Sequence, residues 1–133
     1  MLCPYPMKIT ILHNAVAESD SLAERDVLVQ VAAVEQALSS LGHTTRRLPC
    51  TLNLELVEEV LIDDRPDIVF NLVESLGGSD RLAHLAPALL EDLDLPFTGN
   101  SSVAIHATNN KSLTKQRLQA AGLPTPAWTT CDA

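Results

Sequence analysis

The stretch Asp67-Ile68-Val69-Phe70-Asn71-Leu72 decides the fold that we expect for this sequence. Its apolar side chains are nearly continuous and rich in β-branched and aromatic types, which favours a strand. A strand without polar alternation is typical of a parallel sheet whose two faces are both covered. We therefore expect this strand to be buried on both faces, with helices in the flanking sequence that cover it.

The sequence before this stretch supplies two more predicted strands, Lys8–Leu12 and His43–Leu48. Apolar residues between them recur at helical spacing and predict a helix over Leu22–Leu41. These apolar residues are Val27, Val31, Val34, Leu38 and Leu41. Ser21 and Glu24 have the spacing of a capping box at the start of this helix.

Helices are also predicted on either side of the strand at 67–72. Apolar residues over Leu56–Leu61 predict the preceding helix, which ends at Arg65-Pro66 because a residue before proline avoids the helical conformation. After the strand, apolar residues keep helical spacing from Leu82 to Leu93. Pro87 falls inside that pattern, so we expect a kink or a helix that begins at this proline.

The last third of the sequence predicts one short strand and two short helices. Leu95–Gly99 is expected to form a fourth strand or an extended turn. Ser101 and Asn109 are expected to cap the two helices, the second of which Gly122 closes. An extended segment with two prolines, Leu123–Trp128, follows.

This alternation of strands and helices is the signature of an α/β fold. We expect three layers, α/β/α, around a small parallel sheet of about four strands. Ligands of such sheets bind beyond the carboxyl ends of the strands. In this sequence those ends are the loops His13–Ser21, Asn71–Asp80 and Thr98–Ser102.

Composition narrows the class of protein. A length of 133 residues suits one domain, and 46% hydrophobic residues exclude a wholly disordered chain. A net charge of −8 disfavours nucleic acid and anionic membranes as partners. No apolar run is long enough for a membrane span, and no signal peptide is visible. Three widely spaced cysteines fit neither a disulfide framework nor a zinc site, so we expect a cytoplasmic protein.

Polar residues at the expected strand ends are the candidate ligand contacts. Asn71 and Glu74 follow the third predicted strand and could line a substrate pocket, with Gly77 and Gly78 allowing close approach of a ligand. The alternative is an ordinary loop with turn glycines. Glu24 could hold an ammonium group, or it could simply fold back as the carboxylate of the capping box.

Lys111 is the candidate phosphate contact, because it stands at the start of a predicted helix whose amide hydrogens favour anions. Lys111 and Lys115 lie one helical turn apart, and a solvated surface pair is the alternative. The sequence has neither a Walker loop nor a dinucleotide-binding fingerprint. Its four histidines lack metal-ligand spacing, so no metal site is predicted.

Several of these segments together resemble the D-alanine–D-alanine ligase group of ATP-grasp enzymes. The resemblance runs from about Lys8 to Trp128 and is carried by the order and spacing of its pieces. Besides the strand at 67–72, these are Ala23-Glu24-Arg25-Asp26-Val27, Leu95-Pro96-Phe97-Thr98-Gly99, Asn110-Lys111-Ser112-Leu113-Thr114-Lys115 and Gly122-Leu123-Pro124-Thr125-Pro126.

The resemblance implies a Rossmann-like N-terminal substrate domain. Such ligases use ATP and magnesium to activate a carboxylate as an acyl phosphate, which an amine then attacks. The glutamate matching Glu24 would help to hold the ammonium group of the first amino acid in a catalytic role. The lysine matching Lys111 would contact the phosphates of ATP.

Three departures from the family pattern bear on the substrate. The family has Gly-Gly after the first strand, where this sequence has His13-Asn14. It has His-Gly after the third strand, where Glu74 stands here, and Gly-Glu-Asp-Gly in place of Gly77-Gly78-Ser79-Asp80. We therefore expect an amino acid or small carboxylate that differs from D-alanine.

The length of the chain implies that the ATP-grasp domains of the family are missing. We expect residues 1–128 to form the substrate domain and 129–133 to begin a linker. Such a chain would have no ligase activity and no tightly bound cofactor, because phosphoryl transfer needs nucleotide, metal and acceptor held together. The surface near Leu113, Leu118 and Trp128 would be left uncovered, which predicts a homodimer or a partner contact there.

Two alternatives of other classes stay open at this point. One is a stand-alone α/β binding or interaction module without catalysis. The other is a flavodoxin-like regulatory domain, which would leave the ligase-like pattern unexplained.

Overall fold

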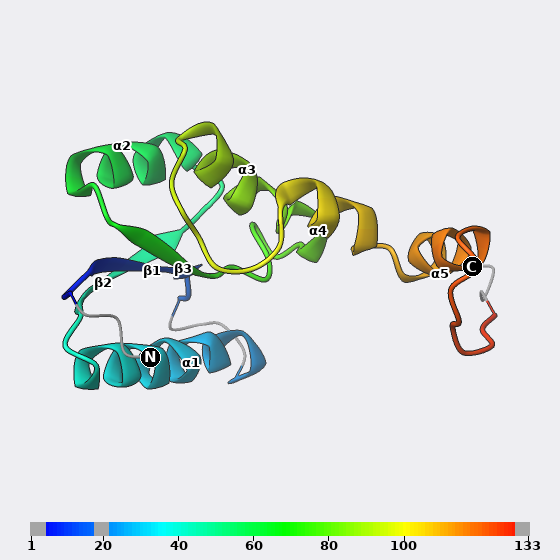
Figure 1. The fold of residues 1–133 in the computed structure, drawn as a ribbon, viewed down its shortest axis with the longest axis horizontal. Helices are drawn as coiled ribbons and strands as arrows, with labels where there is room; N and C mark the ends of the chain where they lie inside the picture. Colours follow the sequence, from blue (N-terminus) through cyan, green and yellow to red (C-terminus); the bar gives the residue numbers. More distant parts are fainter. Residues whose placement is uncertain (1–4, 18–21, 130–133) are drawn as a thin grey trace.

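The computed structural model of the chain describes residues 5–17 and 22–129. The described elements alternate as the α/β pattern predicts (Figure 1). In chain order they are β1 (Lys8–Asn14), α1 (Leu22–Ser40), β2 (Thr44–Cys50), α2 (Leu54–Asp64), β3 (Ile68–Leu72), the 3-10 turn η1 (Asp80–Leu82), α3 (Leu85–Asp92), α4 (Ser102–Thr108) and α5 (Lys111–Ala120). The predicted α/β class is therefore confirmed.

The sheet has three parallel strands in the order β2-β1-β3. Ile9 of β1 pairs with Thr45 of β2 and with Ile68 of β3, so β1 is the central strand. The strand expected at 67–72 packs on both faces, because Val69 belongs to the cluster with Leu61 of α2, whereas Phe70 packs against the cluster with Val27 of α1. It is less deeply buried than β1, since residues 9–13 of β1 are all buried and in β3 Val69 alone is fully buried.

Three layers surround this sheet. Helix α1 covers one face, and α2 and α3 cover the other (Figure 1). A hydrophobic core lies on each face of the sheet. Alternate residues of β1 contribute side chains to the two cores, because successive side chains of a strand point to opposite faces. Ile11 packs with Val27 and Val31 of α1, whereas Leu12 packs with the cluster that includes Leu61 of α2.

The predicted fourth strand is wrong, because the segment around Phe97 makes only an isolated bridge to Val69. Val69 N donates to Pro96 O at 2.8 Å, and Thr98 N donates to Val69 O at 3.0 Å. The ladder stops there because the next amide, Asn71 N, donates to the side-chain oxygen of Thr98 at 3.0 Å. The segment thus covers the outer edge of β3 without extending the sheet.

Helix boundaries depart from prediction at two places. Pro87 lies in the first turn of α3, where a missing amide hydrogen breaks no helical bond, so the helix begins just before the proline and needs no kink there. Asn110, rather than Asn109, caps α5 by accepting from Leu113 N at 3.0 Å. Ser101 caps α4 as predicted, through Ala104 N.

Helices α4 and α5 lead away from the three layers (Figure 1). Glu91 of α3 anchors the start of α4 by accepting from Ser102 N at 2.9 Å, and the hydrogen bonds from Ser102 hold the pKa of Glu91 below its ordinary value. Lys115 of α5 donates to Thr125 Oγ1 at 3.1 Å and to Pro126 O at 3.2 Å. Lys115 therefore holds the extended segment that follows α5 against this helix. The homodimer expected near this segment stays a prediction.

None of the helices in the described ranges combines the length and the apolar character that a membrane-spanning helix needs.

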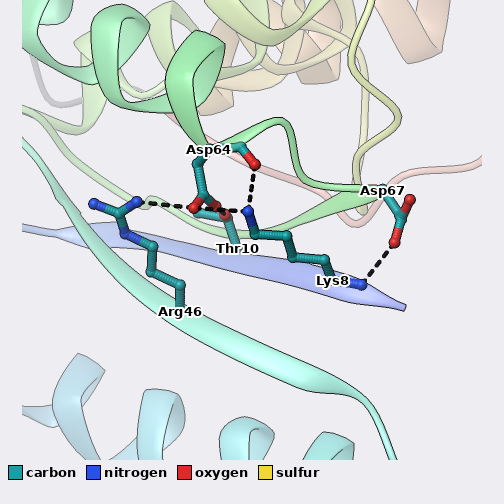
Figure 2. Close-up of polar contacts among 5 residues, drawn as sticks. All are labelled: Lys8, Thr10, Arg46, Asp64 and Asp67. Atoms are coloured by element: carbon teal, nitrogen blue, oxygen red, sulfur yellow. Dashed lines mark hydrogen bonds and ion pairs between the residues drawn. The ribbon is translucent and has the colours of Figure 1, made fainter. Parts of the chain in front are cut away.

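Asp64, the last residue of α2, joins α2 to the amino-terminal ends of β1 and β2 (Figure 2). Its carboxylate lies 3.0 Å from Lys8 Nζ and 2.9 Å from an Arg46 nitrogen, and it accepts from Thr10 Oγ1 at 3.2 Å. Lys8 Nζ also donates to the backbone oxygen of Asp64. On β1, the Lys8 amide donates to the side chain of Asp67 at 2.7 Å. This cluster lies at the opposite end of the strands from the loops in which the ligand contacts are expected, and its contacts join α2 to the sheet.

We expect Asp64→Asn to lower the free energy of unfolding by about 1–2 kcal/mol at pH 7, because its side chain is 10% exposed while both cations are nearly half exposed. Burial tends to raise the pKa of Asp64, but hydrogen bonds from Arg46, Lys8 and Thr10 outweigh it and hold that pKa below 3.8. The contribution is therefore present above about pH 4 and is lost as the pH falls through the folded-state pKa.

Urea unfolding of wild type and Asp64→Asn at pH 7 and pH 3 measures this difference. Asp63→Asn is the matched control, because Asp63 is the exposed neighbour. A wild-type advantage that stays the same at pH 3 would contradict the assignment.

Candidate functional site

Asn14, the last residue of β1, organises the ligand-binding edge of the sheet. Its amide nitrogen donates to Ser75 Oγ at 2.8 Å, and its Oδ1 accepts from Glu74 N at 2.9 Å. One side chain therefore holds the start of the loop that follows β3. Sequence analysis missed this role, although the position of Asn14 directly after the buried strand was a usable signal.

The loop after β3 continues into a tight turn. Leu76 and Ser79 exchange backbone hydrogen bonds at 3.0 and 3.1 Å. Gly77 and Gly78 between them have φ values of 57° and 75°, a conformation that glycine adopts without strain. Leu76 is 2% exposed and anchors the turn in the core. The two glycines therefore form the turn that one alternative predicts, and the approach of a ligand to them stays a prediction.

A cavity of about 360 Å³ opens between this turn and the carboxyl ends of β1 and β2; we call it the strand-end cavity. Its lining residues are Asn14, Ala15, Cys50, Thr51, Leu52, Ser75, Leu76, Gly77 and Gly78. Cys50 is 2% exposed, and burial raises the pKa of its thiol to about 11. The thiol therefore stays protonated at neutral pH and is no nucleophile.

The predicted substrate contacts Asn71 and Glu74 lie beside this cavity in sequence but are not among its lining residues. Asn71 Oδ1 accepts from Val73 N at 3.1 Å, which is a local turn contact. The side chain of Glu74 is exposed, and its carboxylate has no hydrogen-bond or ion-pair partner among the described residues. Glu24 lies in the first turn of α1, and both its side chain and the proposed cap Ser21 fall outside what the structure describes.

Lys111 lies in a second cavity, of about 600 Å³, which we call the α5 cavity. Its lining residues are Asp80, Arg81, His106, Asn109, Asn110, Lys111, Ser112 and Leu113. In the described part of the chain, the side chains of Lys111 and Arg81 have no hydrogen-bond or ion-pair partner. Asn109 donates to Asp80 O and joins the two sides of the cavity. Arg81 is the residue here that sequence analysis missed.

The α5 cavity has the donor set of an anion site. Two cations face it, and the first amides of α5 are at its edge because Asn110 caps that helix. The two cavities share no lining residue, so the structure does not bring Lys111 into one pocket with Asn71 or Glu74. No group of three His, Cys, Asp or Glu side chains among the described residues could hold a metal ion.

The fold is that of a Rossmann-like α/β domain, and it carries two cavities. No protein-family model matches the chain. Curated relatives do: the D-alanine–D-alanine ligase of Moorella thermoacetica is 39% identical over 92% of this chain and 38% of its own length. The enzyme of Aquifex aeolicus is 31% identical over 81% of this chain and 35% of its length, and that of Gloeobacter violaceus is 32% identical over 96% and 39%.

These similarities identify the chain as an N-terminal domain related to the D-alanine–D-alanine ligases, which are ATP-grasp enzymes. The family resemblance expected from the sequence motifs is thereby confirmed. The chain spans between 35% and 39% of the length of these relatives.

Proposed function

We propose that this chain is the substrate domain of an ATP-dependent carboxylate–amine ligase. Similarity to D-alanine–D-alanine ligases over most of the chain supports the class of reaction. The single observation that supports a role in nucleotide contact is the placement in the α5 cavity of Lys111 and Arg81, whose side chains have no partner within residues 5–17 and 22–129. ATP, when bound, would supply the phosphoryl group that activates the substrate carboxylate.

In this proposal the residues of the chain bind and orient. Lys111 and the first amides of α5 hold phosphate oxygens, and Arg81 adds positive charge from the opposite wall. Glu24 and Glu74 offer carboxylates to the ammonium group of the substrate, and Asn71 holds the start of the loop that carries Glu74 by accepting from Val73 N. Magnesium ligands are expected from residues beyond those described, because the described residues offer no cluster for the ion.

We expect the isolated chain to bind the phosphates of ATP without catalysing their release. Phosphoryl transfer requires the nucleotide, the metal and the acceptor to be clamped together, whereas the α5 cavity is open to solvent. We therefore expect no ATP-dependent phosphate release from this chain.

Replacing Lys111 tests the phosphate contact. We expect Lys111→Ala to weaken binding of ATP to the chain at least 10-fold, because a hydrogen bond to a charged group contributes about 1.5–3 kcal/mol. Calorimetric titration with ATP, and amide chemical shifts of Lys111 and Ser112, measure the effect. Arg25→Ala is the matched control, since it removes one exposed positive charge from α1 on the other side of the molecule.

Equal losses of ATP binding in Lys111→Ala and Arg25→Ala would show a non-specific charge effect and overturn the assignment.

The coding sequence beyond codon 133 tests the class of protein separately. A frame that continues into a nucleotide-binding region supports the ligase, and a stop codon there would favour a stand-alone binding module.

A further inference from the structure

The strand-end cavity has a wall without charge. None of its described lining residues is ionised at neutral pH, because the thiol of Cys50 keeps its proton. The α5 cavity, in contrast, is lined by Lys111, Arg81 and Asp80. The two cavities therefore suit different chemical groups.

The polar side chains of this wall are already engaged. Asn14 uses its amide nitrogen on Ser75 Oγ and its oxygen on the amides of Glu74 and Ser75. Thr51 Oγ1 accepts from Asn53 N at 3.1 Å. An ammonium or carboxylate placed inside would lose water and find no side chain of opposite charge among the described lining residues, which costs several kcal/mol.

The remaining wall combines apolar side chains with the backbone of the glycine turn. Leu76 is anchored in the core, whereas Leu52 is 53% exposed and lies against the turn. A Cβ atom at Gly77 would stand 2.5 Å from Leu52 Cδ1, so the close approach of Leu52 to the turn depends on glycine at that position. Ala15 also lines the cavity, and its methyl side chain takes up little of the space.

We propose that the strand-end cavity receives the uncharged side chain of the amino-acid substrate, and that this side chain is larger than a methyl group. This inference rests on the proposed function. A methyl group would leave most of the 360 Å³ to water, whereas a longer apolar chain would displace it. The charged ends of the substrate stay outside, where the carboxylate of Glu74 is exposed next to Ser75.

Titration of the full chain with alanine, norvaline, leucine and glutamate, in both enantiomers, tests the proposal by two-dimensional amide NMR. We expect leucine or norvaline to bind at least 10-fold more tightly than alanine, because each buried methylene adds a few-fold in affinity. The largest shifts should fall on the amides of Ala15, Ser75 and Gly77. Equal affinity for alanine, equal affinity for glutamate or no binding would overturn the proposal.

Filling the cavity provides the matched variants. Ala15→Phe is expected to abolish the preference for leucine, whereas Ala32→Phe on the exposed face of α1 should leave it unchanged. Thr51→Phe fills the same cavity from an exposed position and serves if Ala15→Phe does not fold. A preference for leucine that survives in a folded filling variant would place the side chain elsewhere and overturn the proposal.

These outcomes separate the inference from the function on which it rests. If Lys111→Ala weakens ATP binding but leucine shows no preference over alanine, the side-chain cavity fails and the ligase proposal stands. If leucine binds at Ala15 and Ser75 but ATP does not bind at Lys111, the cavity stands and the chain is a binding module.

Discussion

Leu12→Ala should lower the free energy of unfolding by about 2–5 kcal/mol, the range for a leucine removed from a closed core. Leu12 is 0% exposed in the central strand and pairs in register with Leu48 of β2 and Asn71 of β3. Its side chain belongs to the larger of the two core clusters, between the sheet and the α2–α3 layer. The truncation leaves a cavity that these close neighbours cannot fill.

Such a loss is a large fraction of the roughly 5–15 kcal/mol that stabilises a domain of this kind. Urea unfolding followed by circular dichroism measures it. Leu56→Ala is the matched control, since Leu56 is 55% exposed on α2 and alanine keeps the helix. A cost for Leu12→Ala no larger than that for Leu56→Ala would mean that β1 is not the buried centre of the sheet.

The central position of β1 in the sheet could not be predicted from the local sequence. The hydrophobic pattern of 67–72 correctly predicts a strand that packs on both faces, yet the deepest burial belongs to the strand that has two neighbours. That order comes from the crossovers, and here it gives β1 two partners and leaves β3 with the Phe97 segment at its edge. Thr10 makes β1 look less apolar in the sequence than a buried strand should. Its hydroxyl can be buried because it donates a hydrogen bond to the carboxylate of Asp64 in α2.

Helices were predictable because their signals are local. The periodicity of Val27 and Val31 and the cap at Ser101 need only neighbouring residues, and the structure confirms both. The fourth strand failed for the opposite reason. Whether Asn71 N would meet a backbone or a side-chain oxygen depends on Thr98, 27 residues away.

The candidate site shows the same division. The loop at the carboxyl end of β3 was predictable from chain topology, and Lys111 from its place at a helix start. The hydrogen bond of Asn14 with Ser75 and the cavity that Arg81 shares with Lys111 join distant segments, so local patterns can single out a residue such as Asn14 but cannot predict these pairings. The catalytic role of Glu24, the substrate contacts of Asn71 and Glu74 and the phosphate contact of Lys111 all stay predictions.

Gly77→Ala should cost about 1–2 kcal/mol or slightly more, and the cost should divide into two separable parts. The first and larger part is backbone strain of about 1–2 kcal/mol, because φ is 57° at this position. The second part is displacement of Leu52, whose Cδ1 would lie 2.5 Å from the new Cβ atom; it is the smaller part because the side chain of Leu52 is 53% exposed and can move away. Gly78→Ala isolates the first part, since φ is 75° there and nothing lies within 4 Å of a Cβ atom.

A double-mutant cycle with Leu52→Ala measures the second part. Because shortening Leu52 removes the clash, Gly77→Ala in the Leu52→Ala background should cost about as much as Gly78→Ala does in the wild type. An unchanged cost of Gly77→Ala in that background would mean that backbone strain alone sets the need for glycine. Leu52 would then be free to move, and the wall of the strand-end cavity would not depend on Gly77.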